Sequence, residues 1–167
     1  MIESLINDER AELTQAAKKA APVVLSTRIR LARNLVGPPF PERADVVQRR
    51  DVLTRCADQL SALPQMNKGT FFDIADLSAL EKQVLVERHL ISREQAARSE
   101  GSAIVVNRDQ TLSVMINEED HLRLQSIRSG LHLREAYQLI ANVDKELEQV
   151  LPYAFDHELG YLTACPT

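Results

Sequence analysis

The sequence predicts an α+β domain in which helices flank a largely antiparallel sheet. Two observations lead to this fold class. Short segments with the two-residue alternation of strands are interspersed with longer segments that have helical spacing. Two of the strands, over residues 102–106 and 111–116, are separated only by the turn-forming sequence Asn-Arg-Asp-Gln at 107–110. The sequence therefore favours an antiparallel hairpin within a mixed order of helices and strands.

The first three elements are predicted to be a helix, a strand and a second helix. Residues 2–20 have helical composition, and Pro22 breaks the pattern before a strand over residues 23–34. A rigid proline-rich connector at 37–41 then leads into a helix over about 43–63. We expect the strand to be the first element of the sheet.

The elements that follow continue the mixed order. A short strand over 70–74 precedes a helix that begins at a capping box on Ser78 and ends near His89. After the hairpin, a long amphipathic helix is predicted over 133–150 and a last short strand over 161–164.

The composition is that of a single globular domain. The chain has 167 residues, 44% of them hydrophobic and 26% charged, which provides enough apolar sequence for a core. Its net charge of −4 argues against a nucleic-acid or membrane-surface binder, since both need an excess of basic residues. No apolar stretch is long enough for a membrane span, and the N-terminus lacks the pattern of a signal peptide. We therefore expect a cytoplasmic protein with two reduced cysteines, Cys56 and Cys165.

The strand over 23–34 carries an alternating pattern of arginines. Arg28 and Arg30 share one parity, opposite to that of the apolar positions, so their side chains point the same way about 6.6 Å apart. This spacing suits successive phosphates of a nucleotide, although two solvated cations on an outer sheet face would have the same pattern. Arg33 has the opposite parity, which predicts a structural salt bridge.

An acidic segment follows the strand over 111–116. Glu118, Glu119 and Asp120 lie where sheets often present functional residues, although a solvated acidic loop is the simpler interpretation. A carboxylate near phosphate-binding arginines could orient and deprotonate a guanidinium or hydroxyl nucleophile, or hold Mg²⁺. His121 resembles a zinc ligand, but no second His or Cys lies at ligand spacing.

The strand geometry also distinguishes the two glutamates. In a strand that continues beyond Ile116, Asn117 and Glu119 share a parity opposite to the core positions. We therefore expect Glu119 to face the cleft with Asn117, and Glu118 to turn towards the core side or a loop salt bridge.

The positions of three further side chains, His89, Cys165 and Cys56, also indicate their roles. His89 ends a predicted helix, where a protonated imidazole favours the negative end of the helix dipole. Cys165 is either a small buried strand residue or, because a Pro-Thr turn follows, a thiol at a loop mouth. Cys56 lies on a helix face and is predicted to belong to the core.

Three ordered motifs, at residues 26–34, 117–123 and 160–167, closely resemble those of the ATP:guanido phosphotransferases, the superfamily of creatine and arginine kinases. The segment 80–92 also resembles the bacterial protein-arginine kinases within that superfamily. Only 25 residues precede Ser26, which is too few for the helical domain that metabolite guanidino kinases carry there. This length agrees with the protein-arginine kinases.

The resemblance implies ATP and Mg²⁺ as cofactors, with no protein metal site. By this resemblance, Glu119 aligns and deprotonates the substrate guanidinium, and Cys165 tunes the site electrostatically without forming a covalent intermediate. The implied ATP-binding residues are Ser26, Thr27, Arg28, Ile29, Arg30, His89 and Arg123. The product would be phosphoarginine on a protein, with a kinase activator or a Clp protease system as partners and a homodimer in the full-length protein.

The resemblance divides the chain into a helical leader, residues 1–21, and part of a catalytic domain, residues 22–167. The implied fold is the glutamine synthetase-like domain of guanido kinases, incomplete at the C-terminus. In the family, an Asn-x-Gly-Thr-Gly segment, further arginines and a second catalytic glutamate follow the cysteine. We therefore expect a truncated kinase that is nearly inactive alone. The alternatives are a non-catalytic nucleotide-binding half-domain that partners a full-length kinase, and a free-arginine kinase.

Overall fold

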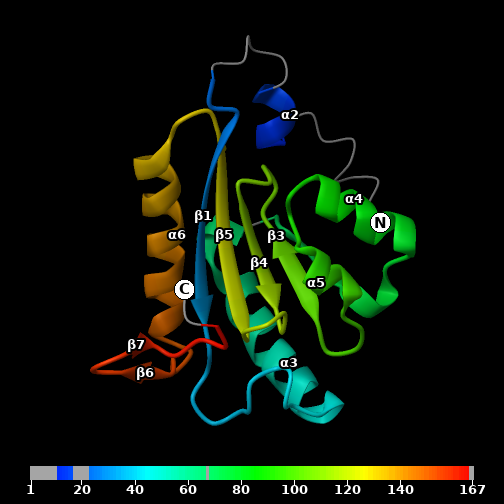
Figure 1. Ribbon diagram of the computed structural model, residues 1–167, viewed down its shortest axis with the longest axis vertical. Helices are drawn as coiled ribbons and strands as arrows, with labels where there is room; N and C mark the ends of the chain where they lie inside the picture. The colour runs from blue at the N-terminus through cyan, green and yellow to red at the C-terminus, as the bar shows by residue number, and fades with distance from the viewer. Residues whose placement is uncertain (1–10, 17–22, 67, 166–167) are drawn as a thin grey trace.

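A five-stranded antiparallel sheet forms the centre of the structure (Figure 1). The computed structural model describes residues 11–16, 23–66 and 68–165. The strand order is β1-β5-β4-β3-β2, and every neighbouring pair is antiparallel. The strands are β1 (Ser26–Arg33), β2 (Thr70–Asp73), β3 (Ala103–Val106), β4 (Leu112–Ile116) and β5 (Leu122–Ser129). The predicted α+β fold and the predicted hairpin are both confirmed.

Helices cover both faces of this sheet (Figure 1). The α-helices are α2 (Glu12–Ala16), α3 (Val46–Ala62), α4 (Ala79–Glu87), α5 (Arg93–Ala97) and α6 (Leu133–Glu148). Two short 3-10 helices are η1 (Pro64–Met66) and η2 (Ile74–Asp76). α3 and α6 pack against one face, and α4 and α5 lie against the other.

The larger core lies between the sheet and the helices α3 and α6. Val105, Val114 and Leu124 come from three neighbouring strands and are all at most 6% exposed. Ile140 of α6 and Cys56 of α3 complete this layer without exposed surface. Burial raises the pKa of the Cys56 thiol to about 12, so this predicted core cysteine stays protonated and unreactive.

A second core lies on the opposite face of the sheet, under α4 and α5. Ile104 of β3 and Met115 of β4 alternate with residues of the first core, and they contact Phe72 of β2 and Leu85 of α4. Among the described residues, β1 and β5 contribute no member to this second core. Their half of this face therefore carries polar side chains.

Helix ends follow the signals in the sequence. Asp45 caps α3, and its box is completed by the Gln48 side chain. Ser78 caps α4 in the predicted capping box with Glu81. The predicted helices over 43–63 and 133–150 begin and end within a few residues of α3 and α6.

The sequence did not predict β5, although this strand lies in the middle of the sheet between β1 and β4. Leu122 and Leu124 face the larger core, whereas Arg123 and Gln125 face the other side. The apolar alternation then breaks, because the buried Ser126 takes the next core-facing position and the buried Ile127 points to the side of Arg28. The short helix α5 was also not predicted.

The predicted last strand over 161–164 is replaced by a small two-stranded ribbon. The strands β6 (Phe155–Asp156) and β7 (Gly160–Tyr161) pair with each other and not with the main sheet. Figure 1 shows this ribbon beside the end of β1. The guanidinium of Arg33 stacks over the Tyr161 ring at 3.7 Å from its centroid, which attaches the ribbon to the sheet.

The N-terminal helix α2 docks on the end of β5 through one acidic residue. Glu12 Oε1 accepts a hydrogen bond from the Ser129 backbone at 3.0 Å, and the Glu12 carbonyl accepts one from the Ser129 hydroxyl at 2.8 Å. Of the predicted helix over 2–20, the structure describes residues 11–16, and the remainder lies outside the described residues.

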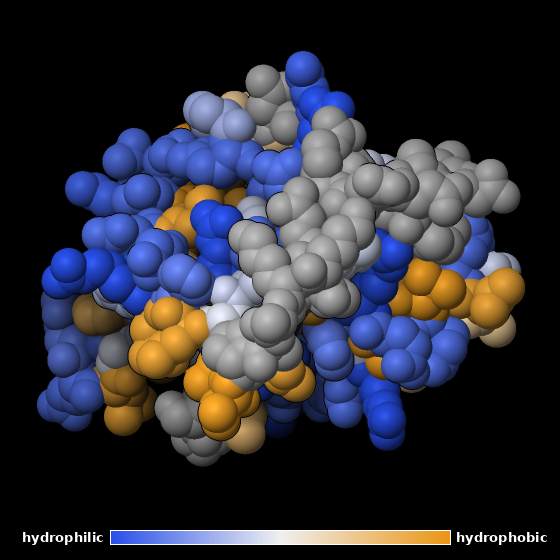
Figure 2. All heavy atoms as spheres, turned by 90° about the horizontal axis from the view of Figure 1, so that it is seen from above, coloured by the Kyte–Doolittle hydropathy of each residue, from blue (hydrophilic) through white to orange (hydrophobic). Residues whose placement is uncertain are grey.

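The surface seen from above is mostly hydrophilic, with separate apolar patches (Figure 2). Large exposed apolar side chains include Val23, Leu25, Leu80 and Leu131. Single exposed apolar residues are normal for a folded domain, so this distribution identifies no particular contact surface.

The ion pair between Arg33 and Asp144 is expected to be costly to break. Its atoms lie 2.6 Å apart, and the side chains are 11% and 13% exposed. Asp144→Ala leaves the Arg33 guanidinium buried without its carboxylate, so we expect the free energy of unfolding to fall by about 3 kcal/mol in urea denaturation.

Glu100→Ala provides the matched control. It breaks the pair between Arg50 and Glu100, whose side chains are 65% and 56% exposed, and should cost less than about 1 kcal/mol. Equal losses in the two variants would contradict the structural role assigned to Arg33.

Candidate functional site

The uncovered half of the sheet brings several polar side chains onto one surface. In the antiparallel pairing of β1 with β5, Arg30 lies opposite Gln125 and Ala32 lies opposite Arg123. Residues opposite each other point to the same side, so Arg28, Arg30, Arg123 and Gln125 share one face. The predicted orientation of the two β1 arginines is confirmed.

Arg28 and Arg30 carry positive charge that no neighbouring carboxylate compensates. Both side chains are exposed, and within the described parts of the chain neither forms an ion pair. Partial burial and the adjacent charge of Arg30 lower the pKa of the Arg28 guanidinium. Two neighbouring cations without a counter-charge fit a ligand with several negative charges.

Arg33 differs from these two arginines in the way that its parity predicts. It points to the opposite face and is paired with Asp144 of α6. The predicted structural salt bridge is therefore confirmed, and Arg33 is not available to a ligand on the open face.

The other β1 positions assigned to ATP binding point in different directions. Ser26 is exposed on the face of Arg28. Thr27 is buried, where its hydroxyl donates to the Gly130 carbonyl at 2.6 Å. Ile29 packs against the larger core. The side chains of Thr27 and Ile29 therefore cannot contact a ligand on the open face, and only their backbone groups remain available for the assigned role.

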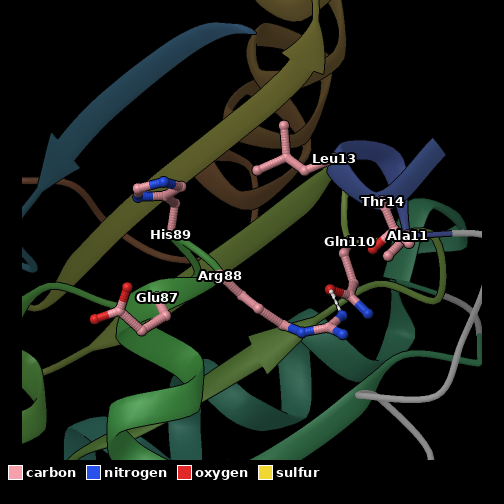
Figure 3. A pocket seen from close by; sticks show the side chains of 7 residues that line it. All are labelled: Ala11, Leu13, Thr14, Glu87, Arg88, His89 and Gln110. Atoms are coloured by element: carbon pink, nitrogen blue, oxygen red, sulfur yellow. Dashed lines mark hydrogen bonds between the residues drawn. The ribbon is translucent and has the colours of Figure 1, made fainter. Parts of the chain in front are cut away.

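His89 lies at the margin of the same face. It follows α4 with a left-handed backbone, φ 59°, and its carbonyl accepts a hydrogen bond from Gln125 Nε2 at 2.6 Å. The His89 ring is exposed and lines a pocket of about 310 Å³ (Figure 3). Other residues lining this pocket are Ala11, Leu13, Thr14, Glu87, Arg88 and Gln110. The pocket thus extends the polar face towards α2.

The acidic segment forms a tight turn, so the predicted continuation of the strand beyond Ile116 is wrong. Asn117 has φ 55°, and its backbone N–H donates to the His121 carbonyl at 3.0 Å. The buried Asn117 side chain donates to the carbonyls of Arg49 and Gly101 at 2.8 and 2.7 Å. Asn117 therefore anchors the turn in the protein and does not face a cleft. We call residues 117–121 the acidic turn.

Arg123 holds the two glutamates of this turn in different environments. Its Nη1 lies 2.9 and 2.7 Å from the two carboxylate oxygens of Glu118, and its Nη2 donates to Glu119 Oε2 at 3.1 Å. Glu118 is fully buried and also accepts from the Ser92 hydroxyl, so it is engaged in the predicted loop salt bridge. The Glu119 side chain remains 39% exposed.

The exposed carboxylate of Glu119 can act on a bound molecule. Its Oε2 accepts a hydrogen bond from Arg123, whereas Oε1 has no hydrogen bond to a described residue. Arg123 itself is only 18% exposed and its charge is compensated by the turn. In this arrangement Arg123 orients carboxylates, unlike the unpaired arginines of β1.

A network that the sequence did not indicate connects β1 to the acidic turn. Asn34, which is fully buried, donates from Nδ2 to Asp120 Oδ1 at 2.6 Å and accepts from the His121 backbone at 2.9 Å. The Asp120 side chain is 2% exposed. The signal for this network in the sequence was the polar Asn34 at the end of an apolar strand. Its partners Asp120 and His121, however, lie 86 and 87 positions away in the sequence.

His121 is bonded through both ring nitrogens. Nδ1 accepts from the Leu35 backbone at 2.9 Å, so Nε2 carries the hydrogen that it donates to the Pro39 carbonyl at 3.0 Å. His121 is therefore a neutral structural residue and is not placed to coordinate zinc. Within the described parts of the chain, no three His, Cys, Asp or Glu residues are grouped to hold a metal ion.

Cys165 is exposed next to the acidic turn and forms no disulfide with a described residue. The preceding Ala164 donates its backbone N–H to Asp120 Oδ1 at 2.7 Å. The Thr163 hydroxyl donates to the Cys165 carbonyl at 2.8 Å. Cys165 therefore lies in a loop near the acidic turn and not in a buried strand. This location agrees with its interpretation as a thiol at a loop mouth.

No helix in the described part of the chain is long and apolar enough to span a membrane.

Comparisons with known proteins agree on one family. The model for "ATP:guanido phosphotransferase, C-terminal catalytic domain" matches residues 51–167. Protein-arginine kinase of Symbiobacterium thermophilum is 43% identical over 88% of this chain and 42% of its own length. That of Halothermothrix orenii is 42% identical over 99% of this chain and 47% of its own length. The chain thus spans about half the length of the curated relatives it matches.

Solved structures show the same fold. The duplicated taurocyamine kinase from Schistosoma mansoni, with bound transition state analog components, superposes with a TM-score of 0.81 and 28% identity. That match covers 93% of this chain and 23% of the other. Lombricine kinase gives a TM-score of 0.74 at 23% identity over 93% of this chain and 48% of the other.

His121 makes stability depend on pH. Burial lowers the pKa of His121 and outweighs the Pro39 hydrogen bond and the Asp120 charge, which favour the protonated ring. The unfolded chain therefore binds a proton more readily, below its usual pKa of about 6.5. We expect the free energy of unfolding to decrease from pH 7 to pH 5, as measured by urea denaturation.

The part of this decrease due to His121 should disappear in His121→Gln. His132→Gln is the control, because the His132 side chain is 52% exposed and the decrease should persist. An unchanged pH dependence in His121→Gln would show that His121 is not the responsible group.

Proposed function

The chain belongs to the ATP:guanido phosphotransferase family, and we propose that it forms part of a protein-arginine kinase. Such an enzyme transfers the γ-phosphoryl group of ATP to arginine guanidinium groups of proteins. One observation carries the proposal: two unpaired arginines share a sheet face whose end bears an exposed carboxylate held by Arg123. The identity of 43% to a protein-arginine kinase supports it.

Arg28 and Arg30 bind the phosphates of the nucleotide in this proposal. Guanidinium groups match phosphate oxygens in charge and geometry, and a bound polyanion relieves the repulsion between the two cations. Ser26, His89, Arg123 and the backbone of β1 complete the proposed nucleotide contacts. Mg²⁺ would supply charge neutralisation on the phosphates in this proposal.

Glu119 is the proposed catalytic base. Its carboxylate takes a proton from the substrate guanidinium, and the freed nitrogen lone pair then forms the bond to the γ-phosphorus. The bond from that phosphorus to the bridging oxygen breaks, and ADP leaves with the electron pair. Arg123 keeps Glu119 oriented, and Cys165 lies beside the acidic turn, where it would tune the charge around the guanidinium.

Protein arginines are the proposed substrates. The relatives named protein-arginine kinase are 42 and 43% identical to this chain, whereas the taurocyamine kinase match is 28% identical. This difference favours a protein substrate over a free guanidino metabolite. We also propose a cytoplasmic location, a kinase activator or Clp protease system as partners, and a homodimer in the complete enzyme.

A second candidate function is a nucleotide-binding half-domain that partners a full-length kinase. The arginine face of β1 and β5 favours it, because the described residues form this face within a five-stranded sheet that has a hydrophobic core on each side. This candidate predicts ATP binding by the chain alone without phosphotransfer.

Phosphotransfer by a complete kinase that includes this sequence tests the proposal. Glu119→Gln keeps the shape of the side chain and removes the base, so turnover at saturating ATP should fall roughly 10²-fold or more. Formation of acid-labile phosphate on an arginine-containing protein measures the turnover, and binding of a fluorescent ATP analogue should change little.

Glu118→Gln serves as the comparison, because Glu118 is fully buried and bonded to Arg123 and Ser92. It should chiefly lower thermal stability. A larger loss of turnover at equal folded fraction in Glu118→Gln than in Glu119→Gln would reverse the assigned roles. Absence of arginine phosphorylation by the unsubstituted kinase would contradict the proposed function itself.

A further inference from the structure

The loop that carries Cys165 is tied to the acidic turn through one carboxylate oxygen. We call residues 162–165 the cysteine loop. Asp120 Oδ1 accepts hydrogen bonds from the Ala164 backbone at 2.7 Å and from Asn34 Nδ2 at 2.6 Å. Asn34 Nδ2 also donates to the Leu162 carbonyl at 3.1 Å. Asp120 and Asn34 thus connect the loop to the acidic turn and to the end of β1.

The same carboxylate lies beside the cation that orients Glu119. Asp120 Oδ2 is 4.0 Å from Arg123 Nη2, and that nitrogen donates to Glu119 Oε2. Asp120 therefore accepts a hydrogen bond from the cysteine loop with Oδ1, and its Oδ2 lies near Arg123, the residue that orients Glu119. Because the Asp120 side chain is 2% exposed, water does not compete effectively for either oxygen.

We propose that Asp120 and Asn34 are positioning residues that fix the cysteine loop relative to Glu119. Neither side chain contacts the reacting groups. Their hydrogen bonds act on the two segments that present the Cys165 thiol and the Glu119 carboxylate. The activity part of this inference rests on the proposed function, whereas the tether itself is a property of the folded chain.

The amide at position 34 and the carboxylate at position 120 are not interchangeable. Asn34 uses both amino hydrogens as donors and its oxygen as an acceptor for the His121 backbone. An aspartate at position 34 would place a second buried carboxylate against Asp120 and would lose both donors. An asparagine at position 120 would keep an acceptor for Ala164 but turn an amino group towards Arg123.

Hydrogen exchange at the Ala164 amide tests the tether on this chain directly. Asp120→Ala removes the acceptor, so the Ala164 amide should exchange roughly tenfold faster or more, as measured by NMR. Asp120→Asn should retain much of the protection. Gln65→Ala is the control, since it removes a hydrogen bond between η1 and Glu146 of α6 at 2.7 Å, away from the loop, and should leave Ala164 protected.

If Asp120→Ala does not fold, Ala164→Pro provides a second variant that breaks the same hydrogen bond. It removes the donor from the exposed end of the same hydrogen bond and leaves Asp120 in place. The Leu162 amide, which donates to the Ala154 carbonyl at 2.9 Å, reports whether the ribbon stays folded. Unchanged exchange at Ala164 in folded Asp120→Ala would overturn the tether. A protected Leu162 amide together with unaltered turnover of the complete kinase in Ala164→Pro would overturn the positioning role.

A complete kinase that includes this sequence separates positioning from mere stability. Asp120→Ala should lower kcat at least tenfold at matched folded fraction while KM for ATP changes less than threefold, and Asp120→Asn should restore part of kcat. Faster Ala164 exchange with unchanged kcat would overturn the positioning role. If the unsubstituted kinase has no activity, the proposed function fails and the exchange data alone decide whether the tether exists.

Discussion

The pairing of Arg123 with the acidic turn is the interaction on which the candidate site depends. A guanidinium in the central strand β5 holds buried Glu118 and exposed Glu119 at once, so the turn has a defined shape at the end of the sheet. A buried carboxylate without this cation would be costly, so the pair contributes to stability. Among the described residues, the neighbouring Arg28 and Arg30 form no such ion pair, and their charge distinguishes the open face of β1 and β5 from the opposite face, where Arg33 is paired.

The two cores explain why this face is available. Among the described residues, the larger core lies under α3 and α6 and takes members from β1, β5, β4 and β3, whereas the second core takes its strand residues from β2, β3 and β4. The strands β1 and β5 are consequently apolar on one side and polar on the other. The fold thus places its unpaired cations where no helix of the second layer covers them, and it places the acidic turn and the cysteine loop at the end of those strands.

Local patterns predicted the parts of the fold that depend on neighbouring residues. The parity of Arg28 and Arg33 correctly placed Arg28 on the open face of the sheet and Arg33 in an ion pair on the opposite face, and the Ser78 capping box was found where expected. The strand β5 was missed because the polar Ser126 takes a core-facing position and the apolar Ile127 points to the other side, so the local alternation breaks. The shape of the acidic turn depends on the left-handed Asn117 and on distant carbonyls, which no local pattern encodes. The assigned roles of Glu119, Cys165 and the ATP-binding residues stay predictions.

The most direct measurement of the central claim is an NMR titration of this chain with ATP, observing the arginine side-chain Nε–H signals. The account predicts that the Arg28 and Arg30 signals shift in a saturable way, because these two cations receive the phosphates. The Arg33 signal should remain unchanged, since its guanidinium is buried against Asp144 on the opposite face. Saturable shifts confined to other arginines, or no shift at Arg28 and Arg30, would contradict the assignment of this face as the nucleotide site.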